Sequence, residues 1–289
     1  MLRGRDEIQI FSKDKLMNGT QLCTLNRQVA QDVCDFVYKA QPNEESVTDY
    51  LLYRLQEANK TFRYINTQQY TRRQEATTGA DYELELWLVG KTSSIPLLIQ
   101  AKKMYKNVNY CDAINYPKKA STQINNLISY ATTNKKLPFY MFYAIPGKTT
   151  KTLCQGNICN QKETKECCCL FLSDANEVKK IANNCITSQS KVSKNDLLAI
   201  SNPFICLFCC PLVCKSHDGI FNYLRHYYKN VAFEDCIVEN QKLPEYVRLI
   251  LEQEKSSEEE NNPMQGIIER YKLDKIKNIA VMKIDDVNS

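Results

Sequence analysis

Alternating apolar and polar residues between positions 80 and 103 form the clearest pattern in the chain. On the first arm, residues of the two kinds take turns: Leu84, Leu86 and Leu88 face one way, and Asp81, Glu83 and Glu85 face the other. A polar turn at 90–94 follows, and the return arm at 96–102 is an apolar run that ends in polar residues. Such alternation around a turn predicts a β-hairpin. If the turn is centred near Lys91–Thr92, Asp81 falls opposite Lys102.

Helical periodicity and apolar runs predict the remaining elements. We expect helices at 26–39, 43–58, 119–132 and 263–273, strands at 61–69 and 137–144, and an acidic linker at 252–262. Asn43 precedes two acidic residues, as an N-cap and a first helical turn should. The order helix, strand, strand, strand, helix, strand indicates an α/β fold with a mixed central sheet flanked by helices. We divide the chain into an N-terminal helical extension (1–42), a core (43–148) and a cysteine-containing region (149–289) that completes the core or is appended to it.

Composition places the chain among ordinary globular proteins. Its 289 residues are 43% hydrophobic and 25% charged, and no apolar run approaches the length of a membrane span. The first residues lack the apolar core of a signal peptide. We therefore expect a cytoplasmic protein that does not contact a membrane. The 14 cysteines are then expected to be reduced thiols, because disulfide frameworks belong mainly to small secreted domains.

The predicted hairpin brings three polar side chains to one place. Gln100 and Lys102 share a face of the return arm, roughly 6.6 Å apart at the usual strand rise, and Asp81 lies across from them. Magnesium prefers oxygen ligands, which a carboxylate and an amide oxygen supply. Lys102 would hold the attacking water or neutralise charge in a transition state. These three residues predict a metal site suited to phosphodiester hydrolysis.

Glu44 is the expected second carboxylate of this site. It shares the inward face of its helix with Val47, Leu51 and Leu55. An acid on such a face is costly to bury unless something pairs with it, and a metal would do so. Three further acids are weaker alternatives, namely Glu45 as the backup, and Glu75 and Glu83.

A basic segment follows the hairpin. Between positions 99 and 136 there are seven lysines and one acidic residue, whereas the whole chain carries a net charge of only +5. Four of these lysines are expected to contact a nucleic-acid backbone: Lys103, Lys106, Lys118 and Lys119. A solvated surface without a ligand is the alternative. Tyrosines within the segment belong to the core or stack on bases, namely Tyr105, Tyr110 and Tyr116.

A second cluster contains sulfur and imidazole ligands of the kind that hold zinc. It comprises Cys206, Cys209, Cys210, Cys214 and His217. Apolar neighbours surround these cysteines, and free cysteine behaves as a small hydrophobe, so core packing is favoured over structural zinc. The other histidine, His226, fits a helix surface or a packing position better than a catalytic one.

The combination of Asp81, Gln100-Ala101-Lys102 and a helix bearing Glu44 resembles the PD-(D/E)XK restriction-endonuclease-like nucleases. The branch in which Gln replaces the second acid is the most similar, and Ala80 stands where the pattern has Pro. Flanking segments between 43 and 146 are also similar to a group of uncharacterised bacterial proteins. The resemblance implies a restriction-endonuclease-like core and a DNA endonuclease that uses Mg²⁺ or Mn²⁺ in defence against phage or foreign DNA. It assigns metal binding to Glu44, Asp81 and Gln100, and a catalytic role to Lys102.

Two other functions stay open at this stage. One is a non-catalytic nucleic-acid-binding module on a degenerate nuclease fold, and the other is a zinc-stabilised interaction protein. Cleavage of two strands would favour a homodimer. A surface for a sensor or regulatory partner protein is expected in the region after Lys148.

Overall fold

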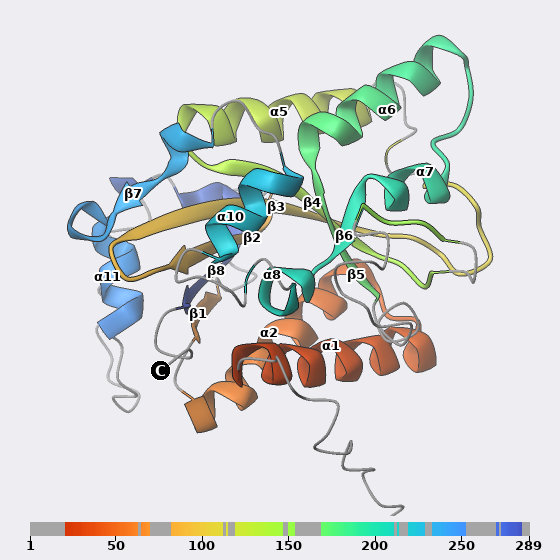
Figure 1. The fold of residues 1–289 in the computed structure, drawn as a ribbon. Coiled ribbons are helices and arrows are strands. Elements are labelled where there is room, and N and C mark those ends of the chain that lie inside the picture. Colours follow the sequence, from red (N-terminus) through yellow and green to blue (C-terminus); the bar gives the residue numbers. More distant parts are fainter. Residues whose placement is uncertain are drawn as a thin grey trace, which may run out of the picture.

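The computed structural model shows an open, twisted sheet between two layers of helices (Figure 1). It describes residues 21–62, 65–69, 82–111, 114, 119–146, 150–153, 169–210, 213, 219–228, 233–252, 270–271 and 273–284. No helix in these ranges is long and apolar enough to cross a membrane.

The sheet is mixed and has eight strands. In spatial order they are β1 (Ile65–Gln69), β8 (Ile276–Lys283), β2 (Tyr82–Val89), β3 (Ser93–Lys103), β4 (Leu137–Tyr143), β5 (Leu170–Asp174) and β6 (Ser201–Pro203), with β7 (Val238–Glu239) paired to the start of β3. Strand β8 runs parallel to β2, and β4 runs parallel to β3, whereas the other pairs are antiparallel. The predicted α/β class with a mixed sheet is confirmed.

Helices cover both faces of this sheet. One face packs against α1 (Gln21–Ala40), α2 (Glu44–Phe62), α8 (Cys206–Cys209) and α10 (Gly219–Tyr227). The other face packs against α5 (Lys119–Thr133), α6 (Ala175–Thr187), α7 (Lys194–Ala199) and α11 (Glu245–Glu252). Single 3₁₀ turns occupy Glu234–Cys236, Asn240–Lys242 and Leu273–Lys275. In Figure 1, α1 and α2 lie below the sheet, and α5 and α6 lie above it.

The hairpin has the predicted register. Val89 pairs with Ser94 and Leu84 pairs with Ile99, so the turn is centred between Lys91 and Thr92. A hydrogen bond of 2.9 Å from the Gly90 N–H to the Ser93 carbonyl closes it. The predicted helix at 119–132 and strand at 137–144 also agree with α5 and β4 within one residue.

Other predicted boundaries were wrong. Helix α1 begins at Gln21 rather than Asn26, and α2 continues to Phe62, so β1 begins only at Ile65. Strand β8 was not predicted. Its central residues are buried on both faces of the sheet, and a strand of this kind reads as one apolar run without alternation. The first residue of the predicted linker (252–262), Glu252, is the last residue of a helix, and the rest of that linker and most of the predicted last helix (263–273) lie outside the described residues.

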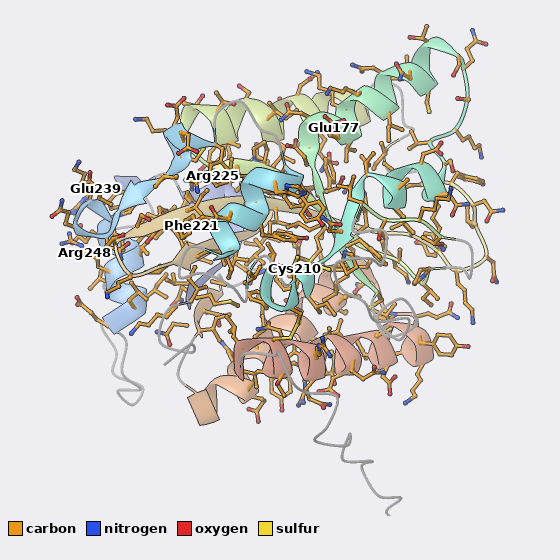
Figure 2. All side chains as sticks on the ribbon, viewed as in Figure 1. Glu177, Cys210, Phe221, Arg225, Glu239 and Arg248 are labelled. Atoms are coloured by element: carbon orange, nitrogen blue, oxygen red, sulfur yellow. A yellow bond between two sulfur atoms is a disulfide. The ribbon has the colours of Figure 1, made fainter. Side chains whose placement is uncertain are left out.

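The two sheet faces and their helices enclose two apolar clusters. Phe221 of α10 and Cys210 after α8 are buried in the first cluster, whereas Glu177 of α6 and Glu239 of β7 lie at the surface (Figure 2). Strands β5, β6, β7 and β8 all come from the region after residue 149, and they belong to the same sheet as the hairpin. The site at the end of the hairpin is therefore set in a sheet that the C-terminal half helps to build.

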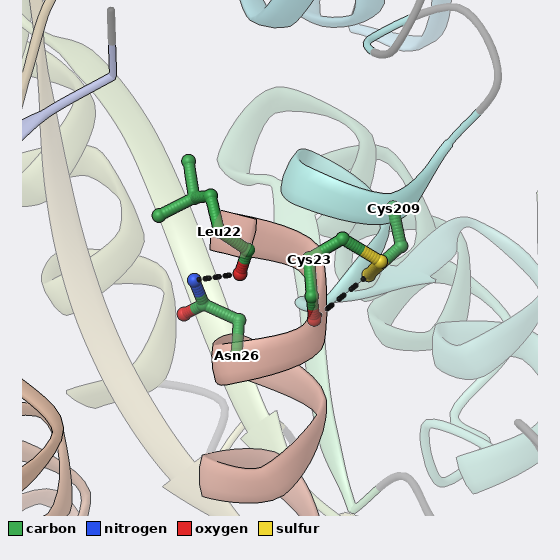
Figure 3. The surroundings of a disulfide bond; sticks show 4 residues. All are labelled: Leu22, Cys23, Asn26 and Cys209. Carbon is green, nitrogen blue, oxygen red and sulfur yellow. Dashed lines mark hydrogen bonds between the residues drawn. A yellow bond between two sulfur atoms is a disulfide. The ribbon is translucent and has the colours of Figure 1, made fainter. Parts of the chain in front are cut away.

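One expectation about the cysteines was wrong. Cys23 of α1 and Cys209 of α8 form a disulfide, with their Cα atoms 4.8 Å apart (Figure 3). The two residues are 186 positions apart, and the packing of α1 on α8 brings them together. Core packing is confirmed for the neighbouring Cys206 and Cys210, which take no part in the disulfide and are buried in the first cluster. Cys214 and His217 lie outside the described residues.

Candidate functional site

The first turn of α2 meets the end of β3. The side chain of Asn43 caps α2, since its Oδ1 accepts a hydrogen bond of 2.9 Å from the Ser46 N–H. This cap fixes the position of Glu44, the first helical residue. Glu44 Oε2 accepts a hydrogen bond of 2.9 Å from the Lys103 N–H, and Glu44 Oε1 lies 3.6 Å from Lys102 Nζ. The Glu44 and Lys102 side chains are 29% and 12% exposed, so solvent and ligands can reach the pair.

Gln100 stands two residues before Lys102 on β3 and is only 5% exposed. Its Nε2 lies 3.4 Å from the Ala101 carbonyl oxygen, a long hydrogen bond. Its Oε1 is buried without a hydrogen-bond partner among the residues that the structure describes. A buried acceptor without a partner costs about 1–3 kcal/mol, so its retention calls for an explanation. A ligand atom that binds Oε1 would remove this cost.

Three of the four predicted catalytic residues lie in the described part of the chain. Glu44 and Lys102 are in contact, and Gln100 precedes Lys102 on the same strand. Asp81 lies outside the described residues, immediately before β2 begins at Tyr82. Glu75 and Lys118 also lie outside them, and for Lys119 only the backbone of α5 is described.

The sequence pattern predicts that Glu83 and Glu85, the two acids of β2, face the same way, but in the structure they lie on opposite faces of the sheet. Glu83 lies close to Thr48 and Glu44 of α2. The neighbouring Leu84 packs into the apolar cluster beneath the same helix. Glu85 instead lies on the opposite face, where it pairs with Lys136. The strict alternation fails because two consecutive residues, Glu83 and Leu84, face α2. Glu83 is thereby placed beside the candidate site.

Lys277 of β8 is a part of this region that the sequence did not reveal. Its Nζ lies 2.8 Å from Glu45 Oε1 and 3.6 Å from Glu83 Oε2. Burial raises the pKa of the Glu83 carboxyl; Lys277 and a hydrogen bond with Thr48 oppose this shift, and the charges of Glu44 and Glu45 add to it. An isolated lysine in a C-terminal segment carries no local signal of such a role, since its partner Glu45 lies 232 positions earlier in the chain.

Thr48 and Tyr143 form a polar contact beneath the acids. Thr48 Oγ1 and the Tyr143 hydroxyl lie 2.6 Å apart, one turn of α2 below Glu44. Burial raises the pKa of Tyr143 well above its usual value, and the charges of Glu83 and Glu44 raise it further. Tyr143 therefore stays a neutral phenol that supports Thr48, and through it Glu83.

The predicted basic segment divides into lysines with different surroundings. Lys103 Nζ donates to the Gln41 carbonyl at 2.9 Å and to the Pro42 carbonyl at 2.5 Å, and partial burial lowers its pKa. Lys106 is exposed. Lys136, counted as part of the basic surface, is instead buried and pairs with Glu85 on the other face of the sheet. Among the lysines of the segment whose side chains are described, Lys102, Lys103 and Lys106 lie at or just after the end of β3, whereas the exposed Lys135 lies before β4.

The donor atoms suit a hard divalent cation. A carboxylate from Glu44 and the unpartnered oxygen of Gln100 are the kind of ligands that magnesium takes together with water. Within the described ranges, no group of three or more His, Cys, Asp or Glu residues is arranged to hold a metal. Cys209, one of the predicted zinc ligands, is bonded to Cys23, and His226 lies exposed on α10, as predicted.

Residues 22–285 match the model of a family of unknown function (DUF6615). The chain belongs to this family. No curated protein and no solved structure matches the chain. The DUF6615 match extends from α1 to the end of β8, so it includes both Glu44 at the start of α2 and Lys277 on the C-terminal strand.

Proposed function

We propose that this DUF6615 protein is a metal-dependent endonuclease of the PD-(D/E)XK type that hydrolyses phosphodiester bonds in DNA. The observation that carries the proposal is the contact of Glu44 with Lys102 beside the unpartnered oxygen of Gln100. A helix acid from α2 contacts a lysine of β3, and the amide of Gln100 stands two residues before that lysine on the same strand, which supports the arrangement that the resemblance implies. The run α2, β1, β2, β3, α5, β4, with β4 parallel to β3, is compatible with a restriction-endonuclease-like core into which β8 is added between β1 and β2.

Each residue of the site has a distinct role in this proposal. Glu44 and Gln100, together with Asp81, would hold Mg²⁺ or Mn²⁺ through oxygen atoms. A bound cation of this kind polarises a phosphoryl oxygen and lowers the pKa of water. Lys102 neutralises the negative charge that develops on the phosphate in the transition state. The Lys103 N–H fixes one oxygen of Glu44, so the other oxygen faces Lys102 and the ligand.

The deciding experiment measures cleavage of supercoiled plasmid with Mg²⁺ or Mn²⁺. Lys102→Ala, Glu44→Gln and Asp81→Ala are each expected to lower the cleavage rate by about 100- to 1,000-fold, the usual loss when one group that stabilises the transition state is removed. Lys180→Ala is the matched control, because Lys180 forms an exposed pair with Glu177 on α6. Equal cleavage by the wild type and the three site variants would refute the proposal. Defence against phage or foreign DNA is proposed from the resemblance alone.

One observation favours a second candidate function, a nucleic-acid-binding module without catalysis. Both carboxylate oxygens of Glu44 already have partners in the chain, one in the Lys103 N–H and the other in Lys102. A site that has lost its metal would close in this way. This candidate predicts salt-sensitive nucleic-acid binding that persists in Asp81→Ala, with no cleavage in the presence of any divalent cation.

A further inference from the structure

Two tyrosines project from the surface beside the candidate site. Tyr105 is 63% exposed and Tyr38 is 53% exposed, and they are the two most exposed large hydrophobic residues in the described part of the chain. Tyr105 follows two residues after Lys103, whose N–H holds Glu44. Tyr38 lies in the last turn of α1, next to the connection that leads to Glu44. Exposed apolar side chains indicate a ligand surface when they belong to one continuous patch, and need no explanation when they are scattered singly.

Lysines join these two rings into one surface. Lys103 Nζ lies 4.9 Å from the centre of the Tyr105 ring, and Lys106 Nζ lies 4.2 Å from the centre of the Tyr38 ring. Both distances are within the range of cation–π interactions. Because Lys106 is adjacent to Tyr105 in sequence, the two contacts bring α1 and the end of β3 together. We call Tyr38, Lys103, Tyr105 and Lys106 the tyrosine–lysine surface.

Other tyrosines with a similar sequence setting do not share this arrangement. Tyr110 is only half-exposed; it forms a β-bridge with Ser193, and Lys191 Nζ lies 3.6 Å from its ring centre, so it helps to hold the chain in place. Tyr116 lies outside the described residues. Tyr53 is as exposed as Tyr38, but its ring lies against Tyr50, with 6.3 Å between ring centres. The structure therefore selects Tyr105 from the predicted stacking residues and adds Tyr38.

We propose that the tyrosine–lysine surface binds unpaired bases next to the cleavage site, an inference that rests on the proposed function. The substrate is then single-stranded or locally unpaired nucleic acid. Aromatic rings with nearby cations are typical of single-strand binding, in which each base stacks on a ring and the lysines follow the phosphates. Bases inside a duplex are already stacked on each other and cannot lie flat on a protruding ring. The positive charge of Lys102, Lys103 and Lys106 complements the phosphates of a strand that leads to Glu44.

Fluorescence anisotropy in EDTA tests this proposal without cleavage. The probes are labelled oligo-dT, labelled oligo-U and a labelled DNA duplex with the same number of phosphates. Tyr105→Ala and Tyr38→Ala are each expected to weaken binding to the single strands by about 5- to 150-fold, and to leave duplex binding unchanged. Tyr105→Phe keeps the ring and should bind like the wild type. Tyr53→Ala is the matched control for the loss of an exposed tyrosine.

The outcomes separate this proposal from the proposed function. Comparable affinity of the wild type for single strands and duplex, unaffected by Tyr105→Ala and Tyr38→Ala, would overturn the stacking role while plasmid cleavage still stood. Absence of binding to all three probes together with absence of cleavage would overturn both, and would point to a protein partner for this surface. A preference for oligo-dT or oligo-U supports stacking in either case and identifies DNA or RNA as the source of the bases.

Discussion

Two lysine–carboxylate pairs lie on opposite sides of the same hairpin, and they differ in what surrounds them. The pair of Glu85 with Lys136 is buried, at 0% and 6% side-chain exposure. Glu85 Oε1 accepts hydrogen bonds of 2.5 Å from Trp87 Nε1 and from the Tyr246 hydroxyl, and Oε2 faces Lys136. The pair of Glu44 with Lys102 is partly open, with Glu44 Oε1 and Lys102 Nζ 3.6 Å apart, and the buried Oε1 of Gln100 has no hydrogen-bond partner among the described residues.

The difference separates a structural network from a binding site. A buried network in which each carboxylate oxygen has donors is complete and holds β2, α11 and the start of β4 together. An open pair beside a buried acceptor that has no hydrogen-bond partner among the described residues leaves room for a ligand to supply that partner. The sequence does not distinguish the two cases, because each pair consists of a glutamate and a lysine of the basic segment between positions 99 and 136.

Breaking the buried pair of Glu85 and Lys136 should give the largest effect on stability. Glu85→Ala leaves the Lys136 ammonium buried without a counter-charge, and the Trp87 and Tyr246 donors lose their acceptor. We expect the free energy of unfolding to fall by about 3–5 kcal/mol. Urea denaturation followed by tryptophan fluorescence measures it, since Trp87 is the only tryptophan. The double variant Glu85→Leu with Lys136→Met should recover the part of the loss that comes from the unpaired ammonium, but not the part from the Trp87 and Tyr246 donors. A fall of less than 1 kcal/mol in Glu85→Ala would show that the network is not closed.

Breaking the partly exposed pair of Glu44 and Lys102 should slow catalysis and leave the free energy of unfolding nearly unchanged. Lys102→Met keeps the length of the side chain and removes its charge, and a partly exposed pair of this kind contributes up to about 1 kcal/mol. We expect an unfolding free energy within that range of the wild type, but plasmid cleavage slower by about 100-fold or more. Lys136→Met is the matched variant, and should show a large loss of stability. Comparable losses of stability in both variants would remove the distinction between the two pairs.

Local patterns predicted the hairpin and the start of α2 because the signals there are short-range. The turn around Gly90 and the alternation of leucines set the register of β2 and β3, and Asn43 with two acids set the start of α2. These signals place Glu44 at the start of α2 and both Gln100 and Lys102 near the end of β3, and Glu44 and Lys102 are in contact in the structure. The face of Glu83 could not, because the change of face at Glu83 and Leu84 depends on packing against α2 and β8.

The features that sequence did not predict are set by contacts between distant segments. Strand β8 lies between β1 and β2 and brings Lys277 to Glu83, and no local pattern specifies that insertion. The bond between Cys23 and Cys209 joins residues 186 positions apart. Burial of Lys136 likewise depends on Tyr246 from α11 and Glu85 from β2. In each case the local sequence is ordinary, and the fold decides the role.

Gln100 offers a smaller and more specific test of the open pair. Gln100→Met keeps the size of the side chain and removes the unpartnered oxygen, so we expect a gain in unfolding free energy of about 1–3 kcal/mol. If that oxygen is a ligand, the same variant should lose the stabilisation that Mn²⁺ gives to the wild type in thermal unfolding, since a bound metal stabilises only the folded state. Gln100→Glu is the control that keeps a ligand oxygen. A Gln100→Met protein that is no more stable than the wild type would show that Oε1 carries no penalty.

Glu83 gives the smallest expected effect, and it depends on pH. Its pKa is raised above the ordinary value of 4.5, mainly by burial, so the folded state holds the proton more tightly than the unfolded state does. The stability from this proton is fully present below pH 4.5 and is lost as the pH rises through the raised pKa. Glu83→Gln removes this dependence, so its unfolding free energy relative to the wild type should increase from acidic pH towards neutrality. Asp35→Asn is a control of opposite sign, because the hydrogen bond from Lys39 lowers the pKa of Asp35. A relative stability of Glu83→Gln that falls as the pH rises would mean that Lys277 outweighs burial and holds Glu83 as a carboxylate, as it would be held beside an occupied metal site.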